Sequence, residues 1–156
     1  MWMVRCDGGK LYEVYKTNKI VSIAWPQIAA YAKLGVSRQD LSKIYASAQP
    51  EAKKGTIISG VSQVWRFVNE IQIGELAISY NPKKRTYLVG AIASVAQYTP
   101  SKFDPSIQII RQVDWLPNEV KRNELSLTTQ KSLGSTLTVF KVAPSAAAEI
   151  KASSSH

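Results

Sequence analysis

The sequence has almost none of the side chains that build disulfides, zinc sites or histidine-based catalysis. Cys6 is the single cysteine among 156 residues, so no disulfide can form within one chain. His156 is the single histidine and the last residue, after three serines, which is the pattern of an expression-tag remnant. A zinc site of cysteines and histidines cannot be assembled. We therefore expect no catalytic residue, no metal site and no cofactor.

Long apolar runs are also missing. No stretch approaches the roughly 20 apolar residues that cross a bilayer. The first five residues lack the apolar segment of a signal peptide. The sequence thus predicts a soluble, cytoplasmic protein with no membrane contact.

Phosphate-binding and nucleophile motifs are absent too, and one weak nuclease pattern needs weighing. Asp104 and Asp114 precede Glu119 and Lys121, which copies the Asp…Glu-x-Lys arrangement with which many nucleases hold magnesium. Glu119, however, follows a Pro-Asn pair, which indicates a loop or a helix start and not the strand that such a site needs. A solvated charged turn is the preferred interpretation, and a small metal-dependent nuclease is the alternative.

Positive charge is abundant. Twenty Lys and Arg against eleven Asp and Glu give a formal net charge of +9, which favours a polyanionic partner and nucleic acid above all. The basic residues gather in two clusters, one before a long predicted helix and one in a predicted hairpin turn. The candidates for phosphate contact are Lys10, Lys53, Lys54, Lys83, Lys84 and Arg85.

Hydrophobic residues make up 45% of the chain, enough for one core, and their spacing predicts a mixed α+β domain. Strands are expected over residues 1–5, 20–25, 75–80, 86–96, 107–115 and 135–142, with 75–80 and 86–96 forming a hairpin. Helices are expected from Ser37 through Tyr45, from Thr56 to Ile71 and over 123–133. The domain should span residues 1–142. Residues 143–156, rich in Ala and Ser, are predicted to be a linker and tag remnant.

Aromatic side chains in a basic domain suggest platforms on which a base can stack. Trp25 ends a predicted strand, directly before Pro26, and Tyr80 precedes the basic turn, so either ring could line a pocket. Tyr98 and Phe103 flank a predicted loop that could close over a base. The other three tryptophans, Trp2, Trp65 and Trp115, follow apolar patterns and are expected in the core.

Several segments in a fixed order carry a family resemblance. They are residues 64–71 (VWRFVNEI), 73–75 (IGE), 78–82 (ISYNP), 87–92 (YLVGAI) and 133–140 (LGSTLTVF). With the opening MWMVR and the IAW of residues 23–25, this order resembles the N-terminal domain of Mrr-type restriction proteins. It also resembles EVE domains and, more remotely, YTH domains, all of the PUA-like class. The resemblance covers the chain to about Val142.

The resemblance implies a PUA-like, curved, barrel-like sheet flanked by helices, with an aromatic pocket that takes a flipped modified base. Trp25 matches the tryptophan that forms one pocket wall in EVE and YTH proteins, and Tyr80 matches the tyrosine that ends an EVE strand. Arg5 matches a basic residue at the end of the first strand, and Ser79 lies near enough for a hydrogen bond. Asn81-Pro82 stand where EVE proteins often have His-Ser, which leaves the identity of the modification open.

By the same resemblance the partner is DNA, as a duplex that carries a methylated or otherwise modified base. The module would guide a restriction endonuclease domain in the same full-length protein, as in type IV restriction and phage defence. The main alternative is a PUA-like module that binds RNA through the same groove. A pure protein-interaction domain is a further alternative, which the positive charge disfavours.

Overall fold

The structure is a computed structural model that describes residues 1–102 and 104–155. The elements in chain order are β1 (Trp2–Val4), α1 (Tyr12–Asn18), β2 (Ile20–Ile23), η1 (Ala29–Tyr31), α2 (Arg38–Ala48), α3 (Lys54–Trp65), η2 (Arg66–Glu70), β3 (Leu76–Asn81), β4 (Thr86–Ile92), β5 (Gln97–Tyr98), β6 (Ile109–Trp115), β7 (Val120–Lys121), η3 (Arg122–Glu124), α4 (Leu127–Ser132), β8 (Val139–Lys141) and α5 (Pro144–Ser154).

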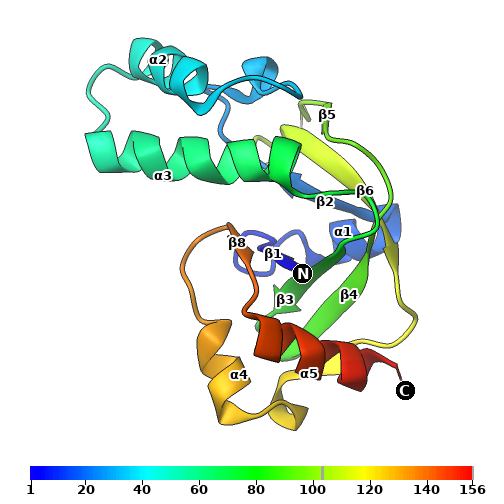
Figure 1. Cartoon of the computed structure of the whole chain (residues 1–156). Coiled ribbons are helices and arrows are strands. Elements are labelled where there is room, and N and C mark those ends of the chain that lie inside the picture. The colour runs from blue at the N-terminus through cyan, green and yellow to red at the C-terminus, as the bar shows by residue number, and fades with distance from the viewer. Residues whose placement is uncertain (103, 156) are drawn as a thin grey trace.

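One curled sheet organises the described residues. Its strands run in the order β2-β6-β4-β3-β1-β8, and the short β5 and β7 pair with β6 and β4. β1 lies parallel to β3 and antiparallel to β8. The α2–α3 pair lies on one side of this half-barrel and the α4–α5 pair on the other (Figure 1). The expected fold class, a mixed α+β domain with a curved, barrel-like sheet flanked by helices, is confirmed.

The predicted hairpin is present as β3 and β4, in register from Leu76 opposite Ala91 to Asn81 opposite Thr86. Its turn is held by Asn81, whose Oδ1 accepts the backbone N–H groups of Lys83 at 3.0 Å and Lys84 at 3.3 Å. A side-chain amide that replaces a backbone acceptor in this way is a common device of tight turns.

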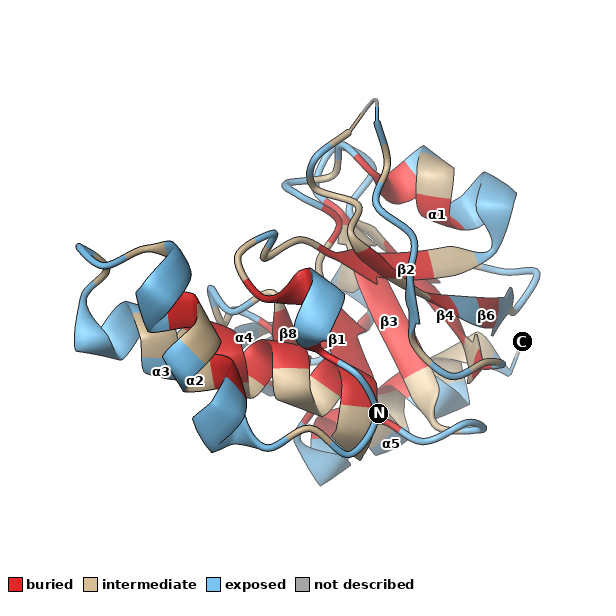
Figure 2. Cartoon of the chain, turned by 90° about the horizontal axis from the view of Figure 1, so that it is seen from above, coloured by how far each residue is buried: buried red, intermediate tan, exposed pale blue. Residues whose placement is uncertain are grey.

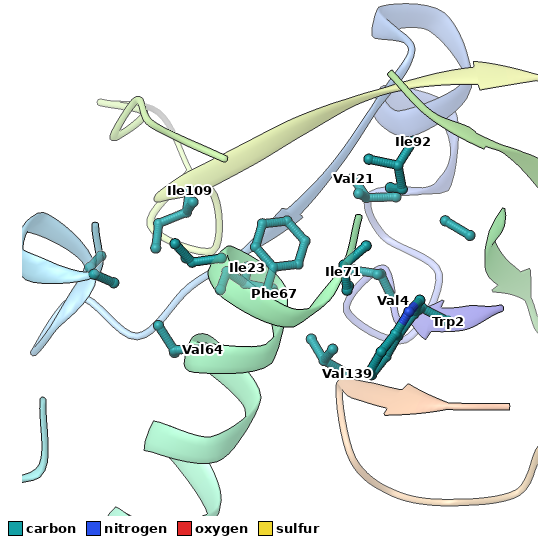
Figure 3. Packing of buried hydrophobic residues seen from close by; sticks show 14 of the residues in the cluster. Trp2, Val4, Val21, Ile23, Val64, Phe67, Ile71, Ile92, Ile109 and Val139 are labelled. Carbon is teal, nitrogen blue, oxygen red and sulfur yellow. The ribbon is translucent and has the colours of Figure 1, made fainter. Parts of the chain in front are cut away.

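Side chains alternate between two apolar cores on the two faces of the sheet, because successive strand residues point to opposite faces. Trp2 and Val4 belong to the core beneath α1, α2 and α3, and Met3 belongs to the core beneath α4 and α5. Figure 2 shows the buried strands between exposed helix surfaces, and Figure 3 shows Trp2, Phe67 and Ile71 among the first core.

Two predicted helices form nearly as expected. Ser37 caps α2 by accepting the backbone N–H of Asp40 at 3.0 Å. The helix predicted over 56–71 is α3, followed by the wider π turn η2. Arg111 of β6 donates hydrogen bonds to the carbonyls of Phe67 and Ile71, which anchors the end of η2 on the sheet.

The prediction of a linker after Val142 is wrong for residues 144–154, which form α5. Ala146 and Ile150 of this helix are buried in the second core. Glu149 accepts hydrogen bonds from the Ser126 backbone N–H and from the hydroxyls of Ser126 and Thr129, so it caps α4. The segment has too little apolar surface to fold alone, but it folds against a core that already exists. His156 lies outside the described residues.

The remaining differences also arise from tertiary contacts. α1 was not among the expected elements; it buries Tyr12 and Tyr15 against the sheet. The helix expected over 123–133 divides into η3 and α4, since Ser126 caps the latter. The last strand is only Val139–Lys141, because the side chain of Arg5 holds the preceding loop by its carbonyls. None of the described helices is long and apolar enough to cross a bilayer.

Candidate functional site

A pocket of about 310 Å³ opens where β2 ends. Residues from the β1–α1 loop, β2, α2 and the loops near 106 and 138 meet around it. The lining consists of Arg5, Asp7, Leu11, Tyr15, Ser22, Ile23, Ala24, Trp25, Pro26, Gln27, Tyr45, Ser106 and Thr138. This volume is at the lower end of the range of small-molecule sites, about 300–1,000 Å³. We call it the Trp25 pocket.

Trp25 has an unusual backbone for a bulky residue, with a φ of 50°. The left-handed region costs an L-residue roughly 1–2 kcal/mol, and such residues concentrate at functional sites. This conformation turns the chain out of β2, and the Trp25 carbonyl accepts the N–H groups of Ile28 and Ala29. β2 ends at Ile23, two residues earlier than the sequence predicted, and Trp25 lies in the loop that follows, where it lines the pocket.

Gly60 of α3 makes room for the indole. A Cβ at this position would lie 2.7 Å from Trp25 Nε1 and 3.3 Å from Tyr45 Cε2. The two rings are therefore neighbours over a helix position that has no side chain. Neither Tyr45 nor Gly60 was recognised as a site residue in the sequence, although an isolated glycine inside an apolar helix pattern is a signal of close approach.

Trp65 and Trp115 differ from Trp25 in how their rings are fixed. The indole N–H of Trp65 donates to the Val36 carbonyl at 3.0 Å, and that of Trp115 donates to the Tyr15 carbonyl at 2.8 Å. Trp2 is 1% exposed. These three rings are structural, as the sequence predicted. Trp25, in contrast, makes no side-chain hydrogen bond to any described residue and lines a pocket.

The polar side chains of the pocket differ in whether they already have hydrogen-bond partners. Tyr15 donates to the Ser22 carbonyl at 2.8 Å, and the Ser22 hydroxyl lies 3.3 Å from the Tyr15 hydroxyl, so both support the pocket floor. Gln27 donates to Gln49, but its own Oε1 is buried without a partner within the part of the chain that the structure describes. Gln27 lines the pocket, but its Oε1 is closed off from solvent and so adds no exposed acceptor to the wall.

Arg5 lines the Trp25 pocket, but its side chain has a structural task. Its Nε donates to the carbonyls of Ser135 at 3.0 Å and Leu137 at 3.2 Å, and its Nη2 donates to those of Leu133 at 2.9 Å and Ser135. Its guanidinium carbon also lies 5.7 Å from the Phe140 ring centre. The sequence predicted that Arg5 contacts the base. The structure corrects this prediction, because Nε and Nη2 of Arg5 hold the 133–137 loop and are not free to contact a base.

Ser79 and Tyr80 do not lie in the Trp25 pocket. Ser79 is fully buried and donates to the Val4 carbonyl at 2.7 Å, which ties β3 to β1, so the prediction of a pocket role for it is wrong. Tyr80 stacks on Tyr87 with ring centres 4.6 Å apart and lines two smaller pockets. The expected union of Trp25 and Tyr80 in one cage is also wrong, because the rings belong to different cores.

The expected loop aromatics have separate outcomes. Tyr98 of β5 is 50% exposed and is not part of the lining of the Trp25 pocket, which corrects its predicted place there. Phe103 lies outside the described residues. Ser106, farther along the same loop, does line the pocket.

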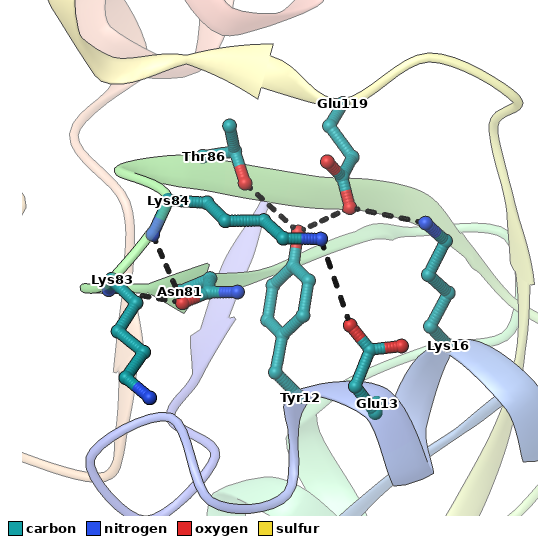
Figure 4. Close-up of polar contacts among 8 residues, drawn as sticks. All are labelled: Tyr12, Glu13, Lys16, Asn81, Lys83, Lys84, Thr86 and Glu119. Carbon is teal, nitrogen blue, oxygen red and sulfur yellow. Dashed lines mark hydrogen bonds and ion pairs between the residues drawn. The ribbon is translucent and has the colours of Figure 1, made fainter.

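The predicted phosphate contacts lie on more than one surface, and all are exposed. The hydrogen bonds from Ser106 lower the pKa of Asp104, and the charge of Lys10, exposed in the loop before α1, acts in the same direction. Lys83 and Lys84 extend from the hairpin turn, where Lys84 Nζ lies 3.9 Å from Glu13 (Figure 4). The remaining predicted contacts, Lys53, Lys54 and Arg85, lie at the start of α3 and at the end of the same turn.

Two of the four residues of the nuclease alternative, Glu119 and Asp104, have other partners. Glu119 accepts the Tyr12 hydroxyl at 2.8 Å and lies 3.5 Å from Lys16 Nζ (Figure 4). Asp104 accepts the Ser106 backbone N–H at 2.9 Å. Across residues 1–102 and 104–155, no three acidic, histidine or cysteine side chains come together as a metal site would need.

Comparison with protein families identifies the family of this chain. A family model described as a domain of unknown function (DUF8426) matches residues 2–143. The match contains every described strand and the whole lining of the Trp25 pocket, and it ends just before α5. A search of curated proteins found no match. The chain therefore belongs to the DUF8426 family.

Proposed function

We propose that this domain binds nucleic acid and accepts one unstacked base in the Trp25 pocket, without catalysing a reaction itself. The favoured ligand is duplex DNA with a methylated or otherwise modified base, flipped out of the helix. The observation that carries the proposal is the pocket: two adjacent aromatic rings, Trp25 and Tyr45, line one cavity of about 310 Å³ in a protein of net charge +9.

The pocket chemistry suits a planar heterocycle. An aromatic face holds a base with roughly 1–3 kcal/mol. Lys10 supports the same ligand class, because it is an exposed cation in a loop that lines the pocket through Asp7 and Leu11, and cations that flank a base pocket contact phosphates. Flipping requires a few kcal/mol of unstacking, which stacking and edge hydrogen bonds together offset.

Discrimination between marked and unmarked bases would be modest. A buried methyl group contributes about 0.8 kcal/mol, which is about fourfold in affinity. The resemblance to Mrr-type proteins supports a role in which the domain brings a nuclease domain of the same full-length protein to foreign DNA in the cytoplasm. A reader of that kind needs only a preference, since cleavage is performed elsewhere.

The test is binding to matched duplexes that are unmodified, cytosine-modified or adenine-methylated, together with an RNA strand, at two salt concentrations. Trp25→Ala removes the ring, and Trp25→Phe keeps an aromatic face. Tyr98→Ala is the matched control, because it removes an exposed ring outside the pocket. Circular dichroism of each variant confirms that it is folded.

We expect preference for one mark, lost in Trp25→Ala, partly kept in Trp25→Phe and unchanged in Tyr98→Ala. From the stacking energy, Trp25→Ala should weaken binding of the marked duplex by roughly 5- to 150-fold. Equal binding to all duplexes, unaffected by Trp25→Ala, would overturn the base pocket. Preference for RNA that still depends on Trp25 would keep the pocket and replace DNA by RNA as the ligand.

A further inference from the structure

A second, smaller pocket lies on the other face of the sheet, between the β1–β3–β4 strands and α4. Its volume is about 110 Å³, roughly a third of that of the Trp25 pocket. Its lining consists of Met3, Arg5, Tyr80, Tyr87, Arg122, Gln130, Leu133 and Gly134. The lining includes two arginines and no acidic residue.

Arg122 is an uncompensated charge in this pocket. Its guanidinium forms neither a hydrogen bond nor an ion pair with the described part of the chain, and its carbon lies 6.0 Å from the Tyr80 ring centre. Its backbone N–H donates to the Arg85 carbonyl at 2.9 Å, which holds the residue beside the basic hairpin turn. Arg122 is thus fixed through its backbone, and its side chain stays available.

Arg5 adds a second guanidinium that is rigidly placed. Its four hydrogen bonds to the 133–137 loop use only Nε and Nη2, so Nη1 is not used in them. A side chain immobilised by neutral carbonyls keeps its full positive charge, because no carboxylate neutralises it. The entropy of ordering one of the two cations is therefore already lost before a ligand binds.

Tyr87 supplies a neutral donor between these cations. It is 2% exposed, and its hydroxyl makes no hydrogen bond within residues 1–102 and 104–155. Burial raises the pKa of Tyr87, and the charges of Arg122, Arg5 and Arg85 act to lower it. Three arginines thus act on one buried phenol, and Tyr80 is the only other ionisable group among those causes.

We propose that the pocket between Arg5 and Arg122 binds a phosphate group. Guanidinium groups match phosphate oxygens in geometry and charge, and the Tyr87 hydroxyl can donate to the same anion. The small volume suits a tetrahedral oxyanion better than a base. Naming the phosphate as part of a nucleic-acid strand rests on the proposed function, since Arg5 lines both this pocket and the Trp25 pocket.

The experiment compares wild type, Arg122→Gln and Lys131→Gln. Lys131 is an exposed cation of neighbouring α4 that does not line the pocket, so its substitution removes one charge and leaves the pocket intact. Binding is measured against salt, on strands in which one internal phosphate at a time is replaced by a neutral methylphosphonate. A second set of strands differs only in the presence of a terminal 5′-phosphate.

We expect Arg122→Gln to weaken binding of all sequences alike and to reduce the slope of log affinity against log salt by about one contact. One neutral linkage should weaken the wild type and leave Arg122→Gln unaffected, which would identify an internal phosphodiester. The same dependence on the 5′-phosphate alone would identify a terminal phosphate. Lys131→Gln should retain the sensitivity of the wild type. If no linkage and no terminal phosphate shows dependence on Arg122, the proposal is overturned.

An experiment can distinguish failure of the phosphate-pocket proposal from failure of the proposed base binding in the Trp25 pocket. The preference for a marked base is the property of Trp25 and should survive Arg122→Gln. If the domain binds no nucleic acid at all, inorganic phosphate titrated against the Nε–H NMR signal of Arg122 decides the second pocket alone. Saturation that chloride at equal ionic strength does not reproduce supports it, and an unchanged signal overturns it.

Discussion

Trp25 Nε1 lies 2.7 Å from the place where a Cβ of Gly60 would be, so the indole of the pocket rests directly on the backbone of α3. Real Cβ contacts are essentially never that short, so a side chain at position 60 would force the ring or the helix to shift. The shape of the Trp25 pocket therefore depends on the absence of one methyl group in a helix.

Gly60→Ala should displace the Trp25 ring and close or distort the pocket. Alanine favours a helix by up to about 1 kcal/mol over glycine, but the collision with the ring should cancel that gain. Gly55→Ala in the same helix is the control, since a Cβ there meets nothing within 4 Å. The measurements are thermal unfolding, tryptophan fluorescence and base discrimination. Equal stabilisation by both substitutions, with unchanged fluorescence, would show that the ring is not confined.

Replacing Arg111 should destabilise the fold strongly. Arg111 is 2% exposed and donates to the carbonyls of Ser94, Phe67 and Ile71, and burial lowers its pKa. Arg111→Met would leave these acceptors without donors, each at about 1–3 kcal/mol, so we expect a loss of about 3–5 kcal/mol. Urea unfolding measures it, and the exposed neighbour Gln112→Ala should stay within about 0.5 kcal/mol. Similar midpoints for the two variants would contradict the prediction.

The C-terminal helix should contribute to global stability. Ile150 is fully buried against the second core, so Ile150→Ala should lower the free energy of unfolding by about 2–4 kcal/mol. Lys151→Ala, at the exposed neighbouring position, should change it by less than about 0.5 kcal/mol. Denaturant unfolding followed by circular dichroism measures both. An unaffected Ile150→Ala variant would mean that residues 144–154 behave as the detached linker that the sequence predicts.

Stability should fall at alkaline pH. Burial is the first cause that raises the pKa of Tyr12 above its ordinary 10.0, and its bond to Glu119 acts in the same direction. Above pH 10 the unfolded chain loses this proton while the folded chain keeps it, so ionisation favours unfolding. Burial likewise raises the pKa of Cys6 above 9.0, so the decline should begin near pH 9.

Tyr12→Phe tests the tyrosine part of this decline. Melting temperatures from pH 7 to 11 should fall less steeply in Tyr12→Phe than in the wild type, because the variant lacks one buried phenol. Tyr98→Phe removes a half-exposed phenol and should follow the wild-type curve. Parallel alkaline declines in the wild type and Tyr12→Phe would refute the assignment.

Local signals predicted much of the fold. The Ser37 cap, the hairpin around Asn81 and the apolar periodicity of α3 depend on neighbours within a few residues, and all three are present. The elements that were missed, α1 and α5, are short or weakly apolar helices. Each forms because a distant surface accepts its few buried side chains, such as Tyr15 and Ile150. Such information is not contained in either segment alone.

The candidate site, like the fold, was predictable from the sequence only where local signals decide the structure. The position of Trp25 beside a pocket could be predicted, because Pro26 ends the strand in the local sequence. The partners of Trp25 could not, since Tyr45 and Gly60 come from two helices whose approach depends on side-chain volumes across the core. Arg5 and Ser79 were assigned to the pocket on sequence order, and both instead satisfy backbone carbonyls of neighbouring segments.

The sequence by itself determined the charge, the fold class and the elements with local periodicity, because these follow from composition and from contacts along the chain. Only the tertiary structure decided which face each strand residue occupies and where each aromatic ring lies. Tyr80 and Trp25 differ in this respect: both lie within two residues of a strand's end, yet they line different pockets because the curled sheet separates them into two cores. Sheet pairing between distant segments fixes that separation, and no local pattern encodes it.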